Sequence, residues 1–80
     1  MKYVYLIQSV DHPGQRYIGL AADLEDRLSK HNEGGSPHTS KFRPWKLVAF
    51  TGFQDEEKAA AYERYLKSGS GRAFASNHLW

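Results

Sequence analysis

The chain has 80 residues, which is the size of one small domain spanning residues 1–80. Hydrophobic residues make up 40% and charged residues 25%, a balance typical of a globular protein and not of a disordered one. The absence of cysteine excludes disulfides, thiolate zinc sites and a cysteine nucleophile, and the formal net charge of +2 is too small to identify a partner.

The first half of the chain predicts a β-hairpin followed by a helix. Residues 3–7 form a continuous apolar and aromatic run of strand length. Residues 11–14 have the composition of a turn, and residues 16–19 are predicted to form the return strand. The helix is predicted over 21–32, because acidic residues come early in this segment, basic residues come late and two glycines follow.

The second half predicts a loop, a strand and two helices. Residues 34–44 are rich in glycine, proline and hydroxyl residues, whereas 45–51 alternate as a strand does. A helix is predicted over 55–67, a break at the Ser-Gly-Ser-Gly segment and a short last helix over 72–77. The order ββαβα(α) predicts an α/β (α+β) fold in which helices flank a small three-stranded antiparallel sheet.

Acidic residues are absent from two stretches of the chain, 34–54 and 64–80. Both stretches carry basic residues with aromatic residues between them, including Lys41, Arg43, Lys67 and Arg72. These side chains are candidates for a substrate-binding face that contacts phosphates. The alternative interpretation, a solvated rim over core aromatic residues, is equally compatible with the pattern.

The first predicted helix places two polar side chains close to its buried face. Leu24 and Leu28 define the inward stripe. At about 100° per residue, Arg27 lies about 60° from Leu24 and His31 about 20° from it. Both side chains are therefore expected on or beside the face that packs on the sheet.

The second predicted helix places Glu63 on its inward side, about 40° from Ala59. Charged groups that face a core are costly unless they are paired or coordinated. Two interpretations follow. One is a structural ion pair from Arg27 to Glu63 that closes the two helices over the sheet. The other is a polar cluster suited to phosphoester chemistry, with a carboxylate for a hard cation and a guanidinium for a phosphate.

Three tyrosines lie on the predicted hairpin. Tyr3 is expected to pack, with its hydroxyl reaching water. Tyr5 and Tyr17 are expected to be cross-strand neighbours, which would bring two phenols into one place.

The sequence resembles the GIY-YIG nuclease domain in features that follow one another in the family's order: Tyr3-Val4-Tyr5, Tyr17-Ile18-Gly19, Arg27 on a helix and Glu63 on a later helix. Segments 23–32 and 63–67 are similar to the small stand-alone bacterial members related to the N-terminal nuclease domain of excinuclease C. The resemblance covers most of the chain. It implies the GIY-YIG endonuclease fold and a metal-dependent endonuclease that hydrolyses DNA phosphodiester bonds in DNA repair or processing.

The resemblance also implies roles for individual residues. Tyr5 and Tyr17 match the tyrosines of the two motifs, which lie near the attacking water, and one of them is the proposed general base. Arg27 matches the arginine that contacts the scissile phosphate, and His31 falls where members carry a histidine or tyrosine close to the site. Glu63 matches the carboxylate that binds one divalent cation, Mg²⁺ or Mn²⁺.

The match is not complete at every position. Tyr3 stands where the first motif has glycine, and Leu20 stands where several members have a lysine, which removes a charge from the site. Asn77 matches a late asparagine near the site and joins the substrate-binding candidates. An unperturbed phenol titrates near pH ~10, so a tyrosine base needs a neighbour that lowers its pKa.

A second function is compatible with the same sequence. The chain has no room for the separate DNA-binding domain that target-specific family members carry. It would then be a catalytically weak nucleic-acid-binding or partner-recruiting module that keeps the fold. Under either hypothesis we expect DNA as a partner, with a protein partner or a homodimer supplying target specificity. The sequence has no membrane-spanning run and no export signal, so we expect a cytoplasmic protein.

Overall fold

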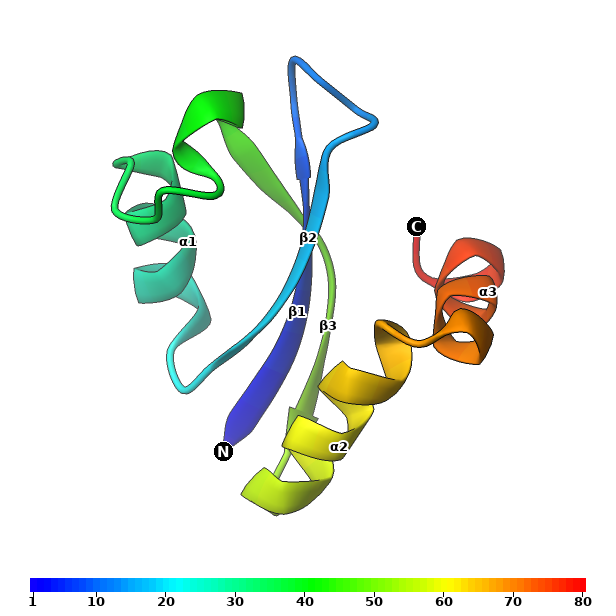
Figure 1. Cartoon of the computed structure of the whole chain (residues 1–80). Helices are drawn as coiled ribbons and strands as arrows, with labels where there is room; N and C mark the ends of the chain where they lie inside the picture. The colour runs from blue at the N-terminus through cyan, green and yellow to red at the C-terminus, as the bar shows by residue number, and fades with distance from the viewer.

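The computed structural model describes all 80 residues. The elements follow in the order β1 (Lys2–Ser9), β2 (Arg16–Ala21), α1 (Leu24–Asn32), the 3₁₀ turn η1 (Ser40–Phe42), β3 (Trp45–Phe53), α2 (Glu56–Leu66) and α3 (Gly69–His78). The strands form one antiparallel sheet in the order β2-β1-β3 (Figure 1). The predicted fold class and element order are confirmed. No helix in the structure is both long enough and apolar enough to cross a membrane.

The central strand is the segment whose apolar residues run without interruption. Val4, Tyr5, Leu6 and Ile7 of β1 are each at most 2% exposed. Successive side chains point to opposite faces of a sheet. Val4 and Leu6 therefore join the core under α2 and α3, whereas Tyr5 and Ile7 join a second core under α1. A strand that is buried on both faces has to be central, which explains why the first strand lies in the middle.

The helices lie on opposite faces of the sheet (Figure 1). Leu24 and Leu28 of α1 pack against the cluster around Tyr5, whereas Ala59 and Leu66 of α2 pack against the other cluster. The prediction that α1 and α2 close together over the sheet is therefore wrong.

The predicted ion pair from Arg27 to Glu63 is likewise absent, because the only ion pairs within the protein join Lys30 to Asp26 and Lys67 to Glu63.

The first helix starts later than the sequence pattern indicates. Ala21 is the last residue of β2, and α1 begins only at Leu24. The side chain of Asp23 caps the helix by accepting a hydrogen bond from the backbone N–H of Asp26 at 3.0 Å. The extended pairing of Ala21 with Tyr3 of β1 overrides the helical propensity of alanine at this position.

The predicted break at residues 68–71 is in fact the start of α3. The Ser68 side chain accepts a hydrogen bond from the Gly71 N–H at 3.2 Å and caps a helix that runs from Gly69 to His78. A Cβ at Gly71 would lie only 1.7 Å from the carbonyl oxygen of Tyr65. Glycine here lets the first turn of α3 pack directly against the end of α2.

Candidate active site

Tyr5 and Tyr17 lie on the face of the sheet that α1 covers. In the strand register Tyr5 is opposite Gly19 and Tyr17 is opposite Ile7. The two tyrosines are therefore diagonal neighbours on adjacent strands. Their ring centroids are 6.2 Å apart, so the expected meeting of two phenols is present.

Gly19 makes this meeting possible. A Cβ at this position would lie 2.5 Å from the hydroxyl oxygen of Tyr5 and 3.0 Å from a ring carbon of Tyr17. The ring of Tyr5 thus lies across the backbone of β2 in space that only a glycine leaves open. Local geometry explains the glycine of the Tyr-Ile-Gly motif without reference to catalysis.

His31 forms the inner end of the cluster and is 3% exposed. Its Nε2 is 2.9 Å from the hydroxyl oxygen of Tyr5, and its Nδ1 is 2.7 Å from the hydroxyl oxygen of Thr39. Thr39 is itself buried, and its carbonyl accepts a hydrogen bond from the indole N–H of Trp45 at 2.7 Å. The last turn of α1, the loop before η1 and the start of β3 therefore hold one imidazole in a fixed orientation.

Charges and burial determine the protonation states of Tyr5 and His31 in this hydrogen-bonded network. Burial, and to a smaller extent the Tyr17 charge, raise the pKa of Tyr5, and Arg27 opposes them; the net pKa is about 12, so Tyr5 is a phenol at neutral pH. Burial and the Arg27 charge lower the pKa of His31, which makes it a neutral imidazole. A neutral imidazole has one ring N–H, so one nitrogen of His31 donates and the other accepts. Either Tyr5 donates to Nε2 while the Nδ1–H donates to Thr39, or Thr39 donates to Nδ1 while the Nε2–H donates to Tyr5.

Arg27 is exposed, in contrast to the inward position that the helical pattern predicted. The residue does start beside the buried stripe, but its long side chain carries the guanidinium outward. The guanidinium still stabilises the charged form of Tyr5 by charge and by hydrogen bonding. It also lines a small cavity of about 180 Å³ together with Tyr17, Lys30 and His31.

Glu63 approaches the cluster from the other face of the sheet. Its side chain is 16% exposed and pairs with Lys67, one turn further along α2. The Lys67 ammonium in turn lies 6.0 Å from the ring centroid of Tyr17. The ring of Tyr17 is 5.1 Å from that of His31 on its other side. Tyr17, on the edge strand β2, is therefore the residue at which groups from both faces of the sheet meet.

The residues present fit a divalent cation that binds through one protein carboxylate. The structure contains no group of three or more histidine, cysteine, aspartate or glutamate side chains that could enclose a metal. Glu63 is the carboxylate paired with Lys67, whose ammonium lies near the ring of Tyr17. Mg²⁺ commonly binds to one or two carboxylates and completes its shell with water and substrate phosphate oxygens. The donor chemistry of Glu63 fits such an ion, and in this structure the carboxylate is paired with Lys67.

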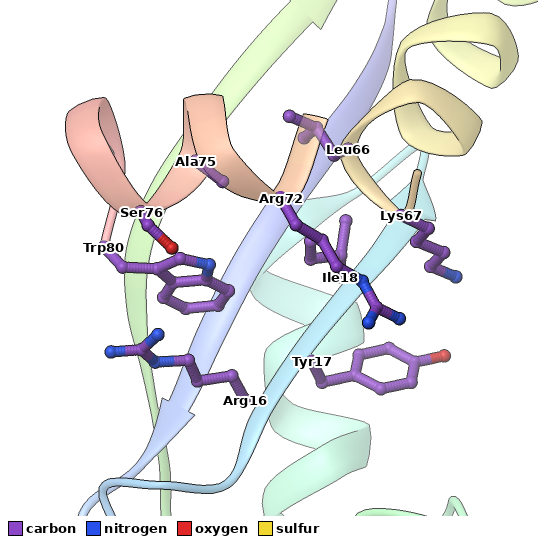
Figure 2. Close-up of a pocket in the computed structure, with 9 residues that line it drawn as sticks. All are labelled: Arg16, Tyr17, Ile18, Leu66, Lys67, Arg72, Ala75, Ser76 and Trp80. Carbon is purple, nitrogen blue, oxygen red and sulfur yellow. The ribbon is translucent and has the colours of Figure 1, made fainter. Parts of the chain in front are cut away.

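The structure divides the predicted substrate-binding residues into two groups. Lys67 and Arg72 line a second and larger cavity beside Tyr17, of about 440 Å³ (Figure 2). Lys41, Arg43 and Asn77 are exposed but line neither cavity. The Arg43 side chain instead donates a hydrogen bond to the carbonyl of Ser40 at 2.9 Å.

The residues that the sequence reasoning missed include Thr39 of the buried cluster and Arg16 and Trp80 of the larger cavity. A lone threonine in a glycine- and proline-rich loop carries no periodic signal. Arg16 and Trp80 are 64 residues apart in the chain and come together only when α3 packs against the sheet. Only the acid-free composition of the last segment pointed in this direction.

Comparison with known proteins identifies the family of the chain. The family model of the GIY-YIG catalytic domain matches residues 1–77. A UPF0213 protein from Clostridium perfringens is 37% identical over 68 residues, which cover 84% of this chain and 71% of the relative. The solution NMR structure of the UPF0213 protein BH0048 from Bacillus halodurans superimposes with a TM-score of 0.56 at 31% identity. The superposition covers 96% of this chain and 84% of the BH0048 chain.

A more distant similarity extends to larger proteins. The structure-specific endonuclease subunit SLX1 from Debaryomyces hansenii is 35% identical over 71 residues, which cover 80% of this chain but only 20% of the relative. The match therefore concerns one part of that larger protein. With the family model matched over nearly the whole length, the chain belongs to the GIY-YIG family of nuclease catalytic domains.

Proposed function

We propose that residues 1–80 act as a single divalent-metal-dependent endonuclease domain that hydrolyses DNA phosphodiester bonds in DNA repair or processing. The proposed site is the β2 edge. Tyr5, Tyr17 and His31 contact one another there, Arg27 lines a cavity with Tyr17 and His31, and Glu63 connects to Tyr17 through Lys67. The observation that carries the proposal is the buried hydrogen-bonded chain from Tyr5 through His31 to Thr39, which lies directly behind Tyr17 and the exposed Arg27 guanidinium. A buried network of this kind is costly to build unless each member is satisfied, as it is here.

Arg27 has the position and chemistry of a phosphate ligand. Its guanidinium is exposed at the mouth of the smaller cavity, and it has no carboxylate partner. A guanidinium binds a phosphate through two parallel hydrogen bonds. Arg27 would therefore hold the scissile phosphate against Tyr17 and neutralise the charge that develops on the phosphoryl oxygens.

The two tyrosines have different tasks in this proposal. Tyr17 lines both cavities, so its hydroxyl is placed to accept a hydrogen bond from the attacking water and to orient it. Tyr5 is 2% exposed and binds His31, so it fixes the imidazole that packs against Tyr17. The raised pKa of Tyr5, about 12, makes this residue a poor base and favours the structural task.

Glu63 would hold Mg²⁺ or Mn²⁺, which supplies Lewis-acid stabilisation of the phosphoryl and leaving oxygens. The Glu63 carboxylate is already paired with the Lys67 ammonium. Binding of a cation at this carboxylate has to compete with that pair.

The competition from Lys67 favours a second candidate function. If the pair of Lys67 with Glu63 persists on DNA, the chain binds nucleic acid or recruits a partner and cleaves weakly or not at all. Its charge-paired glutamate is the observation that supports this alternative.

A cleavage assay separates the two functions. Single-stranded, duplex and branched DNA are incubated with the protein in Mg²⁺ or Mn²⁺, next to Glu63→Gln and Tyr17→Phe. Both variants are expected to lose cleavage by about 100-fold or more, the scale of removing one transition-state contact. Tyr65→Phe, which removes a phenol from the exposed face of α2, is the matched control and should cleave normally.

Two results would contradict the nuclease proposal. Cleavage that persists in both variants would indicate a contaminating nuclease and overturn the site. Binding without cleavage on every substrate would support the second function instead.

A further inference from the structure

The larger cavity lies beside the candidate active site and has no role in the proposed hydrolysis. It is about 440 Å³ and is formed between β2, the end of α2 and α3 with the residues that follow it. Figure 2 shows Trp80 at one side of this cavity and Tyr17 at the other, with the Arg72 side chain extending between them. Since Tyr17 also lines the smaller cavity, the two cavities are neighbours across one side chain. The volume lies within the range of small-ligand pockets.

The lining of the cavity carries three cations and no acid: Arg16, Lys67 and Arg72. Lys67 is paired with Glu63, whereas neither arginine has a carboxylate partner in the protein. Three cations around one cavity repel one another, and an anion relieves this repulsion. The electrostatics therefore favour an anionic ligand whose charge lies near Arg72.

Trp80 supplies a flat aromatic wall. The backbone N–H of Trp80 donates to the carbonyl of Ala75 at 2.9 Å, which fixes the residue after the end of α3. The Arg16 guanidinium lies 4.9 Å from the indole ring, so one planar cation already stacks there. A planar ring of a ligand can stack on the same face of the indole in place of this guanidinium. Proteins hold unpaired bases by stacking them on aromatic side chains.

We propose that this cavity binds one unpaired nucleotide of a DNA strand, with its base against Trp80 and its phosphate on Arg72 and Lys67. The inference rests on the proposed function and refines it. A paired base has both faces covered by its neighbours in the duplex, so it cannot reach the indole, whereas an unpaired base can. A nucleotide held in this cavity lies next to Tyr17. The phosphate that ends its single-stranded segment would then lie in the active site.

The test measures binding in the absence of metal. A fluorescently labelled duplex with a short single-stranded thymidine flap is compared with the same duplex without the flap, by fluorescence anisotropy in EDTA. Trp80→Ala and Arg72→Gln should each weaken flap binding by about tenfold, the scale of losing one stacked base, and should leave blunt-duplex binding unchanged. Trp80→Phe, which keeps an aromatic face, should restore most of the flap affinity.

Arg64→Gln is the matched control for charge, because Arg64 is an exposed arginine of α2 that lines neither cavity. It should not change the preference for the flap. Equal losses on both substrates for Trp80→Ala and Arg72→Gln, or no loss on either, would overturn the proposal.

Intrinsic fluorescence gives a second readout that does not depend on cleavage. The protein has two tryptophans. Trp45 is buried, with only 5% of its surface exposed, and Trp80 is the tryptophan that lines the cavity. Oligothymidine should quench the emission of the protein, and Trp80→Phe should abolish this quenching. Quenching that survives Trp80→Phe would contradict the proposed contact.

The inference and the proposed function fail separately. Cleavage without flap preference overturns only the nucleotide cavity, whereas flap preference without cleavage overturns only the nuclease activity.

Discussion

At the scale of single residues, the most informative side chain is His31. It sits on a short helix with few buried residues, yet it is 3% exposed and both of its ring nitrogens have partners. The helical pattern predicted its inward position, and the structure confirms that position. Its partner Thr39 was not predictable, because the bond spans a loop whose course depends on where β3 pairs with β1.

Thr39→Val should destabilise the protein and loosen the site. The valine has the same shape but leaves the Nδ1 of His31 without a hydrogen-bond partner, which costs about 1–3 kcal/mol in a buried position. Urea unfolding measures the free energy of unfolding, and Thr39→Ser should restore most of it. Thr51→Val is the matched control, since the Thr51 hydroxyl is half-buried in β3 and makes no hydrogen bond within the protein. Equal effects of the two valine variants would contradict the role of Thr39.

The stability of the protein should fall as the pH is lowered below the ordinary histidine range. Burial and the Arg27 charge lower the pKa of His31 in the folded state, so the unfolded chain binds this proton more readily. Stability is therefore retained above pH ~6.5 and decreases below it, until the folded state is protonated as well. Melting temperatures measured between pH 7.5 and 5 should show this slope.

His31→Gln should make the melting temperature depend less on pH over this range. The exposed His38 provides the control, because His38→Gln should leave that pH dependence unchanged. An unchanged slope in His31→Gln would show that other groups control the pH dependence.

At the scale of elements, the ends of the helices are set by contacts between elements and not by composition. The two glycines and two serines of residues 68–71 are typical of a break, and they do separate α2 from α3. They also start α3, because Ser68 caps it and Gly71 fits against the carbonyl of Tyr65. Helix α1 begins later than the sequence predicts for a similar reason, because Ala21 pairs with Tyr3 in the sheet.

Gly71→Ala should destabilise the junction between α2 and α3. The added Cβ would lie 1.7 Å from the Tyr65 carbonyl oxygen, so the two helices have to separate. We expect a loss of about 1–3 kcal/mol in unfolding free energy, the usual cost of overpacking. Gly69→Ala tests propensity alone, because nothing lies within 4 Å of a Cβ at Gly69 and alanine favours a helix. It should be neutral or stabilising in the same urea titration, and a similar loss in both variants would contradict the packing explanation.

At the scale of the whole molecule, the site lies at an edge of the sheet and not between two helices on one face. Helix α1 covers one face and α2 with α3 the other (Figure 1). His31 of α1 and Lys67 at the end of α2 both lie near Tyr17 of the edge strand β2. The net charge of +2 conceals this organisation. Five cations line the two cavities around Tyr17, and two of them, Lys30 and Lys67, are paired with carboxylates: Arg16, Arg27, Lys30, Lys67 and Arg72.

DNA binding through this edge should depend strongly on salt. On DNA that carries a single-stranded flap, four of these cations that each neutralise one phosphate, three on the duplex and Arg72 on the flap, give a slope of log K against log salt of about −3.4, or about a 100-fold loss of affinity from 50 to 200 mM salt. Arg72→Gln should reduce the slope by about 1 for DNA with a single-stranded flap, measured by anisotropy over that range. Arg64→Gln should leave it unchanged. A second copy of the protein that adds phosphate contacts would make the slope of log K against log salt steeper at higher protein concentration. A protein partner that adds such contacts would have the same effect when it is present.

The sequence by itself determined the type and order of the strands and α-helices, and its motifs supplied the residues proposed for the site. Local periodicity records which side chains face a core, and the motif residues are contiguous or lie on one helix face. Only the tertiary structure decided which face each helix covers, that Arg27 and Glu63 do not pair, that Thr39 holds His31, and that Arg16, Arg72 and Trp80 enclose a cavity. These features depend on strand register, side-chain reach and helix packing between segments far apart in the chain, and no local pattern encodes them.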